Sequence, residues 1–396
     1  MGMSSPPVLR VAIVGAGFMG KMHAHAWRTA HRFFSLDAIP EIAVLVGRDA
    51  ARTADAAREF GALAASTDWR EVVARADIDV VDICTPGDTH AEITLAALAA
   101  GKHVLCEKPL ATSVVDAERM VVAAAAAPDL VAMCGFSYRR TPALSLAREL
   151  VTAGRLGEIR HVRAQYLQDW LSDPDAPFTW RLDRERAGSG TLGDIGAHSI
   201  DTAQWLSGER ITAVSALTRT FVTDRPELTE QVGLGGRAVQ GASRRDVTVD
   251  DAAAFTATFA GGAIGVFEAT RMATGRRNAN RIEINGSRGS ISFDFERLNE
   301  LEFYDATDPA GEQGFRRIQV TEPEHPYAAA RWPAGHGLGY EHGFTHQIVD
   351  FVRAITAGTK PSPSFAEAAQ VQRVLAAVED SAARGSIMTA VEGAPS

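Results

Sequence analysis

The chain has 396 residues, of which 46% are hydrophobic and 22% are charged, a composition typical of a globular protein long enough for two domains. Its formal net charge of −9 and its lack of basic runs exclude a surface built for nucleic acid. Its longest apolar runs, such as residues 120–127, are too short to cross a bilayer, so we expect no membrane partner.

The N-terminal segment and the cysteines both favour a cytoplasmic location. Residues 1–10 lack the apolar core of a signal peptide. Cys84, Cys106 and Cys134 each end a short apolar segment, and an odd number of buried thiols is typical of a reducing compartment. We therefore expect free thiols and a cytoplasmic protein.

The first third of the chain alternates short apolar strands with amphipathic helices. We expect strands at 11–14, 42–46, 80–84, 103–106 and 130–134, and helices near 19–30, 50–60, 69–75, 89–100 and 113–127. Such alternation predicts an α/β domain with a doubly wound parallel sheet, which we place over residues 8–135.

From residue 159 onwards the apolar residues recur with period two. We expect strands at 162–166, 214–220, 253–259, 263–267, 282–284, 290–295 and 301–304, several of them joined by glycine-containing hairpin turns. Helices are expected near 193–206, 340–357 and 365–385. This pattern predicts an α+β domain with a mostly antiparallel sheet over residues 136–396.

The segment Gly15-Ala-Gly-Phe-Met-Gly20 lies between the first expected strand and the first expected helix. Its glycines allow a tight turn, close approach of a pyrophosphate and packing of helix on strand, with the helix N-terminus facing the anion. A glycine-rich turn of another βα unit is the structural alternative, but the flanking strand and helix favour dinucleotide binding. The candidate cofactor-binding residues here are Gly15, Gly17, Phe18, Met19 and Gly20.

The second strand ends in Gly47-Arg48-Asp49. An NAD-preferring site usually carries an acidic residue there, which accepts hydrogen bonds from the adenosine ribose. Arg48 can instead pair with a 2′-phosphate, although it is also interpretable as a solvated residue before a helix that Asp49 caps. We expect NAD(P) as the cofactor, with a lean towards NADP.

Two further strands end at the carboxyl edge of the expected sheet, where ligands bind in doubly wound folds. Thr85, Pro86 and His90 follow one of them and are candidates for the nicotinamide side of the cofactor site. Glu107 and Lys108 follow the next and are further candidate cofactor contacts. Lys108 precedes a proline, which restricts its backbone, and a desolvated lysine there can act in acid–base chemistry. A strand-capping surface lysine is the alternative.

Asp194 and His198 lie four residues apart in a segment that we expect to be helical, so they share one face. Asp194 can orient the imidazole while His198 takes a proton. A structural Asp–His contact is the alternative, but the glycines at 190, 193 and 196 indicate close approach of another group to this helix.

Aromatic and polar side chains alternate in two short segments, 166–170 and 180–181. Flat apolar faces beside hydrogen-bonding groups suit a carbohydrate ring, so Gln168, Trp170, Trp180 and Arg181 are candidate substrate contacts. The alternative, given equal weight, is that the two tryptophans belong to an inter-domain core.

His342 and His346 are spaced for one helix face, but the glutamate of the zinc-protease motif is missing between them. We therefore assign no metal site.

Three motifs in this order resemble the Gfo/Idh/MocA oxidoreductases, and the resemblance covers essentially the whole chain. They are Gly15-Ala-Gly-Phe-Met-Gly20, Glu107-Lys108-Pro109 and Gly193-Asp-Ile-Gly-Ala-His198. The resemblance implies a Rossmann domain, then a domain with an open sheet whose exposed face forms homodimers or homotetramers. It also implies that Lys108 is the active-site lysine and that Asp194 and His198 are the catalytic pair.

Within this family, residues 136–142, 166–170 and 187–190 look most like levoglucosan dehydrogenase and neighbouring sugar and inositol dehydrogenases. This resemblance adds Tyr138 to the candidate substrate contacts, beside Asp194 and His198. It implies a small carbohydrate or polyol as the substrate.

The leading hypothesis is an NAD(P)-dependent dehydrogenase that moves a hydride between nicotinamide and a secondary alcohol of a sugar, anhydro-sugar or cyclitol. An alternative is a glycosidase of the same family that retains its NAD cofactor and oxidises the ring only transiently. A third is a non-catalytic regulator that senses the cofactor, which we would expect to have lost Lys108 or His198.

Overall fold

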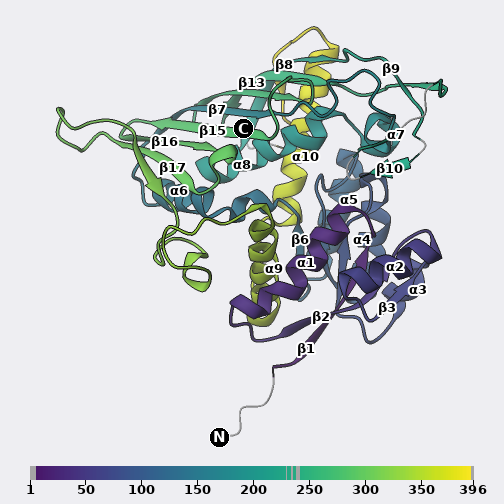
Figure 1. The fold of residues 1–396 in the computed structure, drawn as a ribbon. Coiled ribbons are helices and arrows are strands. Elements are labelled where there is room, and N and C mark those ends of the chain that lie inside the picture. Colours follow the sequence, from purple (N-terminus) through teal and green to yellow (C-terminus); the bar gives the residue numbers. More distant parts are fainter. Residues whose placement is uncertain (1–5, 229, 233–234, 238–240, 394–396) are drawn as a thin grey trace, which may run out of the picture. The chain divides into compact units, whose positions relative to one another are not determined.

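The computed structural model describes residues 6–228, 230–232, 235–237 and 241–393 (Figure 1). The chain divides into two compact units. Unit 1 contains Met1–Ser137 and Gly339–Ala369, and unit 2 contains Tyr138–Leu338 and Gln370–Ser396. The segment Gly339–Ala369 therefore groups with the N-terminal part of the chain, whereas the sequence pattern placed it in a second domain of residues 136–396.

Unit 1 is built on a parallel sheet with the strand order β3-β2-β1-β4-β5-β6. All its strand pairs are parallel, which confirms the predicted doubly wound sheet. The strand that the sequence analysis missed, β3, has only three residues, Ala-Ala-Ser, and no apolar run. The strands are β1 (Val8–Val14), β2 (Ile39–Val46), β3 (Ala64–Ser66), β4 (Val80–Ile83), β5 (His103–Cys106) and β6 (Ala132–Cys134).

The helices between these strands begin at capping side chains where the sequence offers them. Asp49, Asp68 and Ser113 each accept a hydrogen bond from a backbone N–H in the first turn that follows. The helices are α1 (Phe18–Phe33), α2 (Ala50–Phe60), α3 (Trp69–Ala74), α4 (His90–Ala99) and α5 (Val114–Ala126), with a 3₁₀ turn at Gly87–Thr89.

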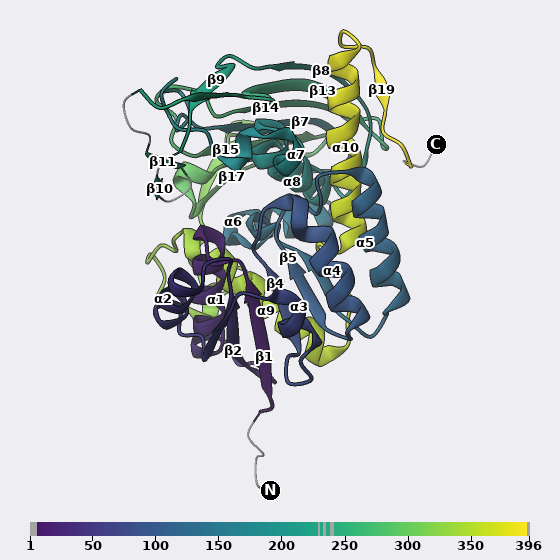
Figure 2. The ribbon, with the colours of Figure 1, turned by 90° about the vertical axis from the view of Figure 1, so that its right-hand side faces the viewer.

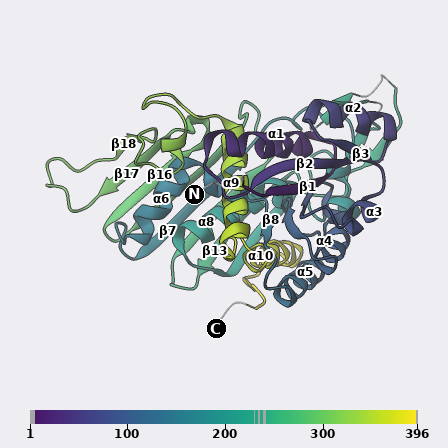
Figure 3. The same ribbon diagram turned by 90° about the horizontal axis from the view of Figure 1, so that it is seen from below.

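Helix α9 (Tyr340–Ala357) lies beside α1 although more than 300 residues separate them (Figure 3). The rings of Trp27 and Phe351 meet edge to face with centroids 6.0 Å apart, and Phe34 meets His346 at 5.7 Å. His342 accepts a hydrogen bond from the Gly339 N–H at the start of the helix. Both histidines on this helix therefore have structural roles.

Unit 2 is built on a mixed sheet with the order β18-β17-β16-β15-β7-β14-β13-β8-β19. Only β7 and β14 pair in parallel among its described strands, which confirms the mostly antiparallel prediction. The strands are β7 (Ile159–Leu167), β8 (Ile211–Arg219), β13 (Ala252–Phe259), β14 (Ile264–Thr270), β15 (Ala279–Gly286), β16 (Gly289–Asp294), β17 (Glu300–Asp305), β18 (Arg316–Gln319) and β19 (Thr389–Ala390).

Shorter elements surround this sheet. They include the helices α6 (Pro142–Thr152), α7 (Arg184–Ala187) and α8 (Ala197–Ser207), 3₁₀ turns at Ser137–Arg140, Trp180–Leu182, Phe295–Arg297 and Ala328–Ala330, and a π-helical turn at Leu192–Gly196. Two small strand pairs join β9 (Asp224–Pro226) to β12 (Arg244–Asp246) and β10 (Glu230–Val232) to β11 (Gly235–Arg237).

Helices cover one face of the large sheet. Figure 2 shows α8 against β7, and in helix α10 (Phe365–Ala383) Ser381 accepts a hydrogen bond from the Ala216 N–H of β8. Side chains on β14 alternate between buried and exposed, as expected for a sheet with one covered face. Apolar residues remain exposed on the opposite face: Leu217 (66%), Ile264 (52%) and Val266 (51%).

None of the helices in the described part of the chain combines the length and the apolar character that a bilayer-crossing segment needs.

Candidate active site

The glycine motif forms the turn from β1 into α1. Gly15 has a φ of +121°, and a Cβ there would lie 2.6 Å from the Cys84 carbonyl oxygen. A Cβ on Gly20 would overlap the Gly15 carbonyl oxygen, so the helix packs onto the turn. At Gly17, the N-cap of α1, a Cβ would meet no protein atom within 4 Å. A pyrophosphate therefore has room to reach the backbone there, and the residues fit a dinucleotide.

Phe18 and Met19 open the first turn of α1, which contains no acidic side chain. Phe18 is exposed and Met19 is half-buried. The positive end of the helix dipole is thus not neutralised by a carboxylate of its own first turn.

Arg48 is exposed after β2, and Asp49 caps α2 by accepting a hydrogen bond from the Arg52 N–H at 2.8 Å. The space beside Gly47 is already filled. A Cβ on Gly47 would overlap the hydroxyl of the buried Thr53, which donates to the Asp49 carbonyl oxygen at 2.6 Å. An acidic residue at position 47 therefore requires a change at Thr53 as well.

Thr85 and Pro86 follow β4 and are half-buried, and His90, predicted with them to lie on the nicotinamide side, is buried. The His90 ring is buried, and its nitrogens lie 3.0 Å from the Pro109 carbonyl oxygen and 2.9 Å from the Thr85 carbonyl oxygen. Both ring nitrogens are thus engaged by the backbone. His90 therefore ties the turn after β4 to the turn after β5.

Glu107, the other predicted cofactor contact at this edge, is 4% exposed and points into unit 1. Its Oε1 lies 3.0 Å from the His23 Nε2, and its Oε2 accepts from the Lys108 N–H at 3.2 Å. The half-buried Lys108 therefore directly follows a carboxylate that is hydrogen-bonded to the buried His23.

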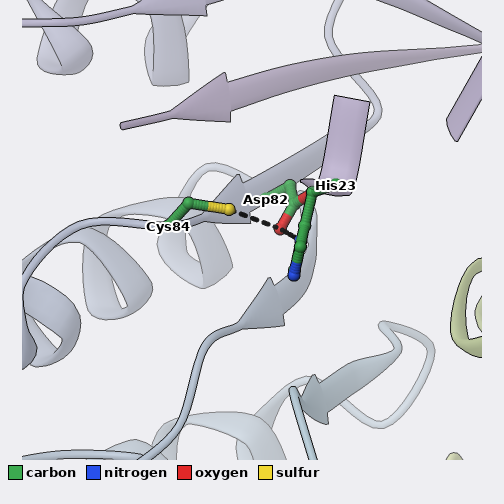
Figure 4. A group of neighbouring side chains, drawn as sticks. All are labelled: His23, Asp82 and Cys84. Carbon is green, nitrogen blue, oxygen red and sulfur yellow. Dashed lines mark hydrogen bonds and ion pairs between the residues drawn. The ribbon is translucent and has the colours of Figure 1, made fainter. Parts of the chain in front are cut away.

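Sequence reasoning missed the buried cluster around His23 (Figure 4). The His23 Nδ1 lies 2.9 Å from the Asp82 carboxylate, which also accepts from the Trp27 Nε1 at 2.7 Å and faces the Cys84 thiol at 3.6 Å. The signal was present, because Asp82 interrupts the apolar strand β4 and a buried carboxylate needs partners.

His23, Asp82 and Cys84 offer donor atoms close enough together to suggest a metal ion. Burial, with a contribution from Asp82, raises the pKa of the Cys84 thiol to about 12. The sulfur is therefore a protonated thiol that donates to Asp82. We interpret the group as a hydrogen-bonded cluster.

In unit 2, Asp194 lies in the π-helical turn that leads into α8. Its Oδ2 accepts a hydrogen bond from the Nη1 of Arg271 at 3.1 Å, with Arg271 fully buried and Asp194 26% exposed. Packing within unit 2 requires glycine at two positions of this segment. A Cβ on Gly190 would overlap the Asp250 backbone, and one on Gly193 would overlap the Ser189 hydroxyl.

His198 lies in the first turn of α8 among aromatic rings. Its ring centroid is 4.5 Å from that of Tyr138 and 6.0 Å from that of Tyr166. The two tyrosine hydroxyls are 2.6 Å apart, and Tyr166 donates to the Asn278 Oδ1 at 2.9 Å. Burial raises the pKa of Tyr138 well above its usual value, so this hydroxyl stays protonated.

The remaining predicted contacts belong to the same network. Gln168 donates to the Asn278 Oδ1 at 2.8 Å and accepts from the Trp170 Nε1 at 2.9 Å. The Arg271 guanidinium carbon lies 5.6 Å from the centre of the Trp170 ring. Arg271 also donates to Asp194, so it connects Trp170 to that carboxylate.

Arg181 stacks on Trp180, with its guanidinium carbon 4.5 Å from the ring centre. Burial lowers the pKa of Arg181, while the charge of Asp194 raises it and that of Arg271 lowers it. Arg181 is therefore within the electrostatic reach of the Asp194–Arg271 pair.

The structure thus joins five predicted substrate contacts of unit 2 through side-chain contacts: Tyr138, Gln168, Trp170, Asp194 and His198. Sequence reasoning did not find Arg271, which directly follows β14 and pairs with Asp194. It also did not find Asn278, which directly precedes β15 and accepts from Tyr166 and Gln168. Aromatic faces beside paired amide, hydroxyl and charged groups suit a polyhydroxylated ring.

Two protein-family models match the chain. A model described as an oxidoreductase family with an NAD-binding Rossmann fold covers residues 9–135. A model described as the GFO/IDH/MocA C-terminal domain covers residues 144–292.

Two of the similar proteins are named as dehydrogenases. Levoglucosan dehydrogenase from Pseudarthrobacter phenanthrenivorans is 42% identical over 96% of this chain and 97% of its own length. Inositol 2-dehydrogenase from Rhizobium meliloti is 28% identical over 90% of this chain and 91% of its own length.

Solved structures agree with these matches. An oxidoreductase domain protein from Kribbella flavida has a TM-score of 0.92 and 56% identity, covering 97% of this chain and 99% of its own. A levoglucosan dehydrogenase in complex with NADH has a TM-score of 0.91 and 41% identity over the same shares. With both domain models and whole-length relatives in agreement, this chain belongs to the Gfo/Idh/MocA family and is an NAD-binding oxidoreductase.

Proposed function

We propose that the protein oxidises a secondary alcohol of an anhydro-sugar of the levoglucosan type, reversibly and with a nicotinamide cofactor. The observation that carries this proposal is the network in unit 2 that joins Tyr138, Gln168, Trp170 and Asp194 around His198. It offers aromatic surface and fixed polar groups, and an anhydro-sugar has both apolar ring faces and hydroxyls. The 42% identity to a levoglucosan dehydrogenase over nearly the whole chain supports the choice of substrate.

Each group has a role in the proposed mechanism. The turn at Gly15, Gly17 and Gly20 holds the dinucleotide, which supplies the hydride acceptor when it is bound. His198 removes the hydroxyl proton as the alcohol is oxidised, and Lys108 donates a hydrogen bond to the same oxygen and stabilises its developing negative charge.

The buried Arg271 pairs with Asp194, and its positive charge favours the ionised carboxylate. A carboxylate favours the imidazolium that His198 becomes when it takes the proton. The polar atoms of Gln168 and Asn278 orient the remaining hydroxyls of the ring.

Reduced-nicotinamide absorbance tests the proposal directly. Levoglucosan, 1,5-anhydro-sugars, common aldoses and inositols are each supplied with NAD or NADP. We expect the highest kcat/KM with levoglucosan or another anhydro-sugar. Activity confined to inositols would contradict the substrate class, and turnover of a chromogenic glycoside without net reduction of cofactor would favour the glycosidase alternative.

We infer from Arg48 that NADP(H) binds at least as well as NAD(H). A guanidinium pairs with the 2′-phosphate through charge-assisted hydrogen bonds worth about 1.5–3 kcal/mol, which corresponds to roughly 10- to 150-fold in Kd. Arg48→Ala is therefore expected to weaken NADPH binding by that factor and to change NADH binding by less than about threefold. Fluorescence titration of both reduced cofactors measures it. A wild type that prefers NADH tenfold or more, with Arg48→Ala unchanged, would refute this role.

A variant designed to favour NADH places an acidic residue at position 47, where Thr53 already fills the space. Gly47→Asp alone would overlap the Thr53 hydroxyl, so it is combined with Thr53→Ala, which removes that oxygen. The double variant is expected to shift preference towards NADH, with Thr53→Ala alone as its control.

We also propose that the exposed face of the unit 2 sheet mediates self-association into dimers or tetramers. Leu217, Ile264 and Val266 leave apolar side chains on it. Val266→Asp is expected to lower the mass measured by light scattering towards that of the monomer. Val122→Asp on α5, where the valine is 69% exposed, is the matched control. A monomeric wild type would contradict the proposal.

A further inference from the structure

His23 joins three elements of unit 1 with one side chain. It stands on α1 three residues after Gly20, and its side chain is fully buried. Its Nδ1 lies 2.9 Å from Asp82 on β4, and its Nε2 lies 3.0 Å from Glu107, directly after β5. The helix that opens the dinucleotide motif is thereby tied to the turn that carries Lys108.

Glu107 uses its two carboxylate oxygens for different partners. Oε1 faces His23, and Oε2 accepts the Lys108 N–H at 3.2 Å. Gly135, directly after β6, makes room for this arrangement, because a Cβ there would lie 2.7 Å from Oε1. The Lys108 peptide is thus held by a carboxylate that His23 holds in turn.

The charge on His23 strengthens this link. Burial alone lowers the pKa of His23, but the charge and hydrogen bond of Asp82 raise it well above its usual value. The groups that face the ring are Asp82 and Cys84 from β4, Glu107 after β5, and the uncharged ring of Phe344 from α9 at 5.7 Å. The ring is therefore a cation between two carboxylates, and such hydrogen bonds are stronger than neutral ones.

We propose that His23 is a positioning residue for Lys108, acting through Glu107. The inference rests on the role proposed above for Lys108. Loss of the His23–Glu107 hydrogen bond lets the Glu107 carboxylate turn, which moves the Lys108 peptide and its ammonium group relative to the reacting oxygen. A misplacement of about 1 Å at a catalytic group costs on the order of 100-fold in rate.

Replacing His23 by asparagine or by glutamine tests its hydrogen bonds to Asp82 and to Glu107 separately. The amide nitrogen of an asparagine occupies the place of Nδ1, and that of a glutamine the place of Nε2. His23→Asn therefore keeps the bond to Asp82 and loses the bond to Glu107, whereas His23→Gln does the reverse. Both remove the buried charge.

We expect His23→Asn to lower kcat with NAD and levoglucosan by about 10- to 100-fold, with the Kd of NADH changed less than about threefold. His23→Gln is expected to stay within about threefold of wild-type kcat. Trp27→Phe is the matched control, because it removes the other buried donor to Asp82 without touching Glu107. Equal loss in the two His23 variants, or equal loss in Trp27→Phe, would overturn the proposal.

A double-mutant cycle separates this inference from the proposed function. In a Lys108→Ala background, His23→Asn is expected to change the residual kcat by less than about twofold, because its effect passes through the missing lysine. A full additional loss would show that His23 does not act through Lys108. Near-normal kcat in Lys108→Ala alone would instead remove the lysine from the proposed mechanism.

Hydrogen exchange tests the positioning without any substrate. In the cofactor-free full-length protein, the peptide covering residues 103–110 is expected to exchange faster in His23→Asn than in His23→Gln or Trp27→Phe. Identical exchange in all three variants would show that His23 does not hold this turn.

Discussion

Lys108→Ala is expected to lower kcat by about 100- to 10,000-fold while the Kd of NADH changes by less than about threefold. In our proposal Lys108 stabilises charge that develops on the reacting oxygen, an interaction made mainly in the transition state. The dinucleotide is held separately, by the turn at Gly15, Gly17 and Gly20. Steady-state kinetics and fluorescence titration of NADH on the same preparation measure the two effects.

Lys102 provides the control for this substitution because it precedes β5, whereas Lys108 follows it. Its ammonium group donates to the carbonyl oxygens of Arg75 and Ile78 at 2.7 and 2.8 Å. Lys102→Met is expected to lower the free energy of unfolding and to leave kcat nearly unchanged. A Lys108 variant with near-normal turnover would remove this residue from the chemistry.

His198→Ala is expected to lower kcat by about 100- to 10,000-fold and to remove the acidic limb of the pH–rate profile. A histidine base accepts the alcohol proton only in its neutral form, and histidines titrate near about pH 6.5. Activity of the wild type should therefore fall as the pH drops through this range. The pH dependence of kcat/KM for both proteins measures the effect.

The same experiment separates the two candidate bases. If the acidic limb persists in His198→Ala, the titrating group is not His198, and Lys108 becomes the base. If the acidic limb is still present in Arg271→Met but lies at a different pH, the Asp194–Arg271 pair changes the pKa of the base and is not itself the base.

Most of unit 1 was predictable because its signals are local. Apolar runs alternating with amphipathic helices specify a parallel sheet, and Gly15 and Gly20 occupy positions where a Cβ would meet the backbone. β3 was missed because three small residues carry no hydrophobic pattern. The helix over 340–357 was predicted correctly as an element, but its packing on α1 depends on contacts such as Trp27 with Phe351 that no local pattern records.

In the candidate site, the sequence alone determined the chemical groups, the strand ends and the helix turn on which they lie, and the family that combines them. Only the tertiary structure decided what each side chain contacts. It places Glu107 against His23 and both nitrogens of His90 against backbone carbonyls, and it brings Arg271 to Asp194 from the end of the distant strand β14. The physical reason is that buried polar groups must find partners, and those partners are set by the packing of distant elements rather than by neighbours along the chain.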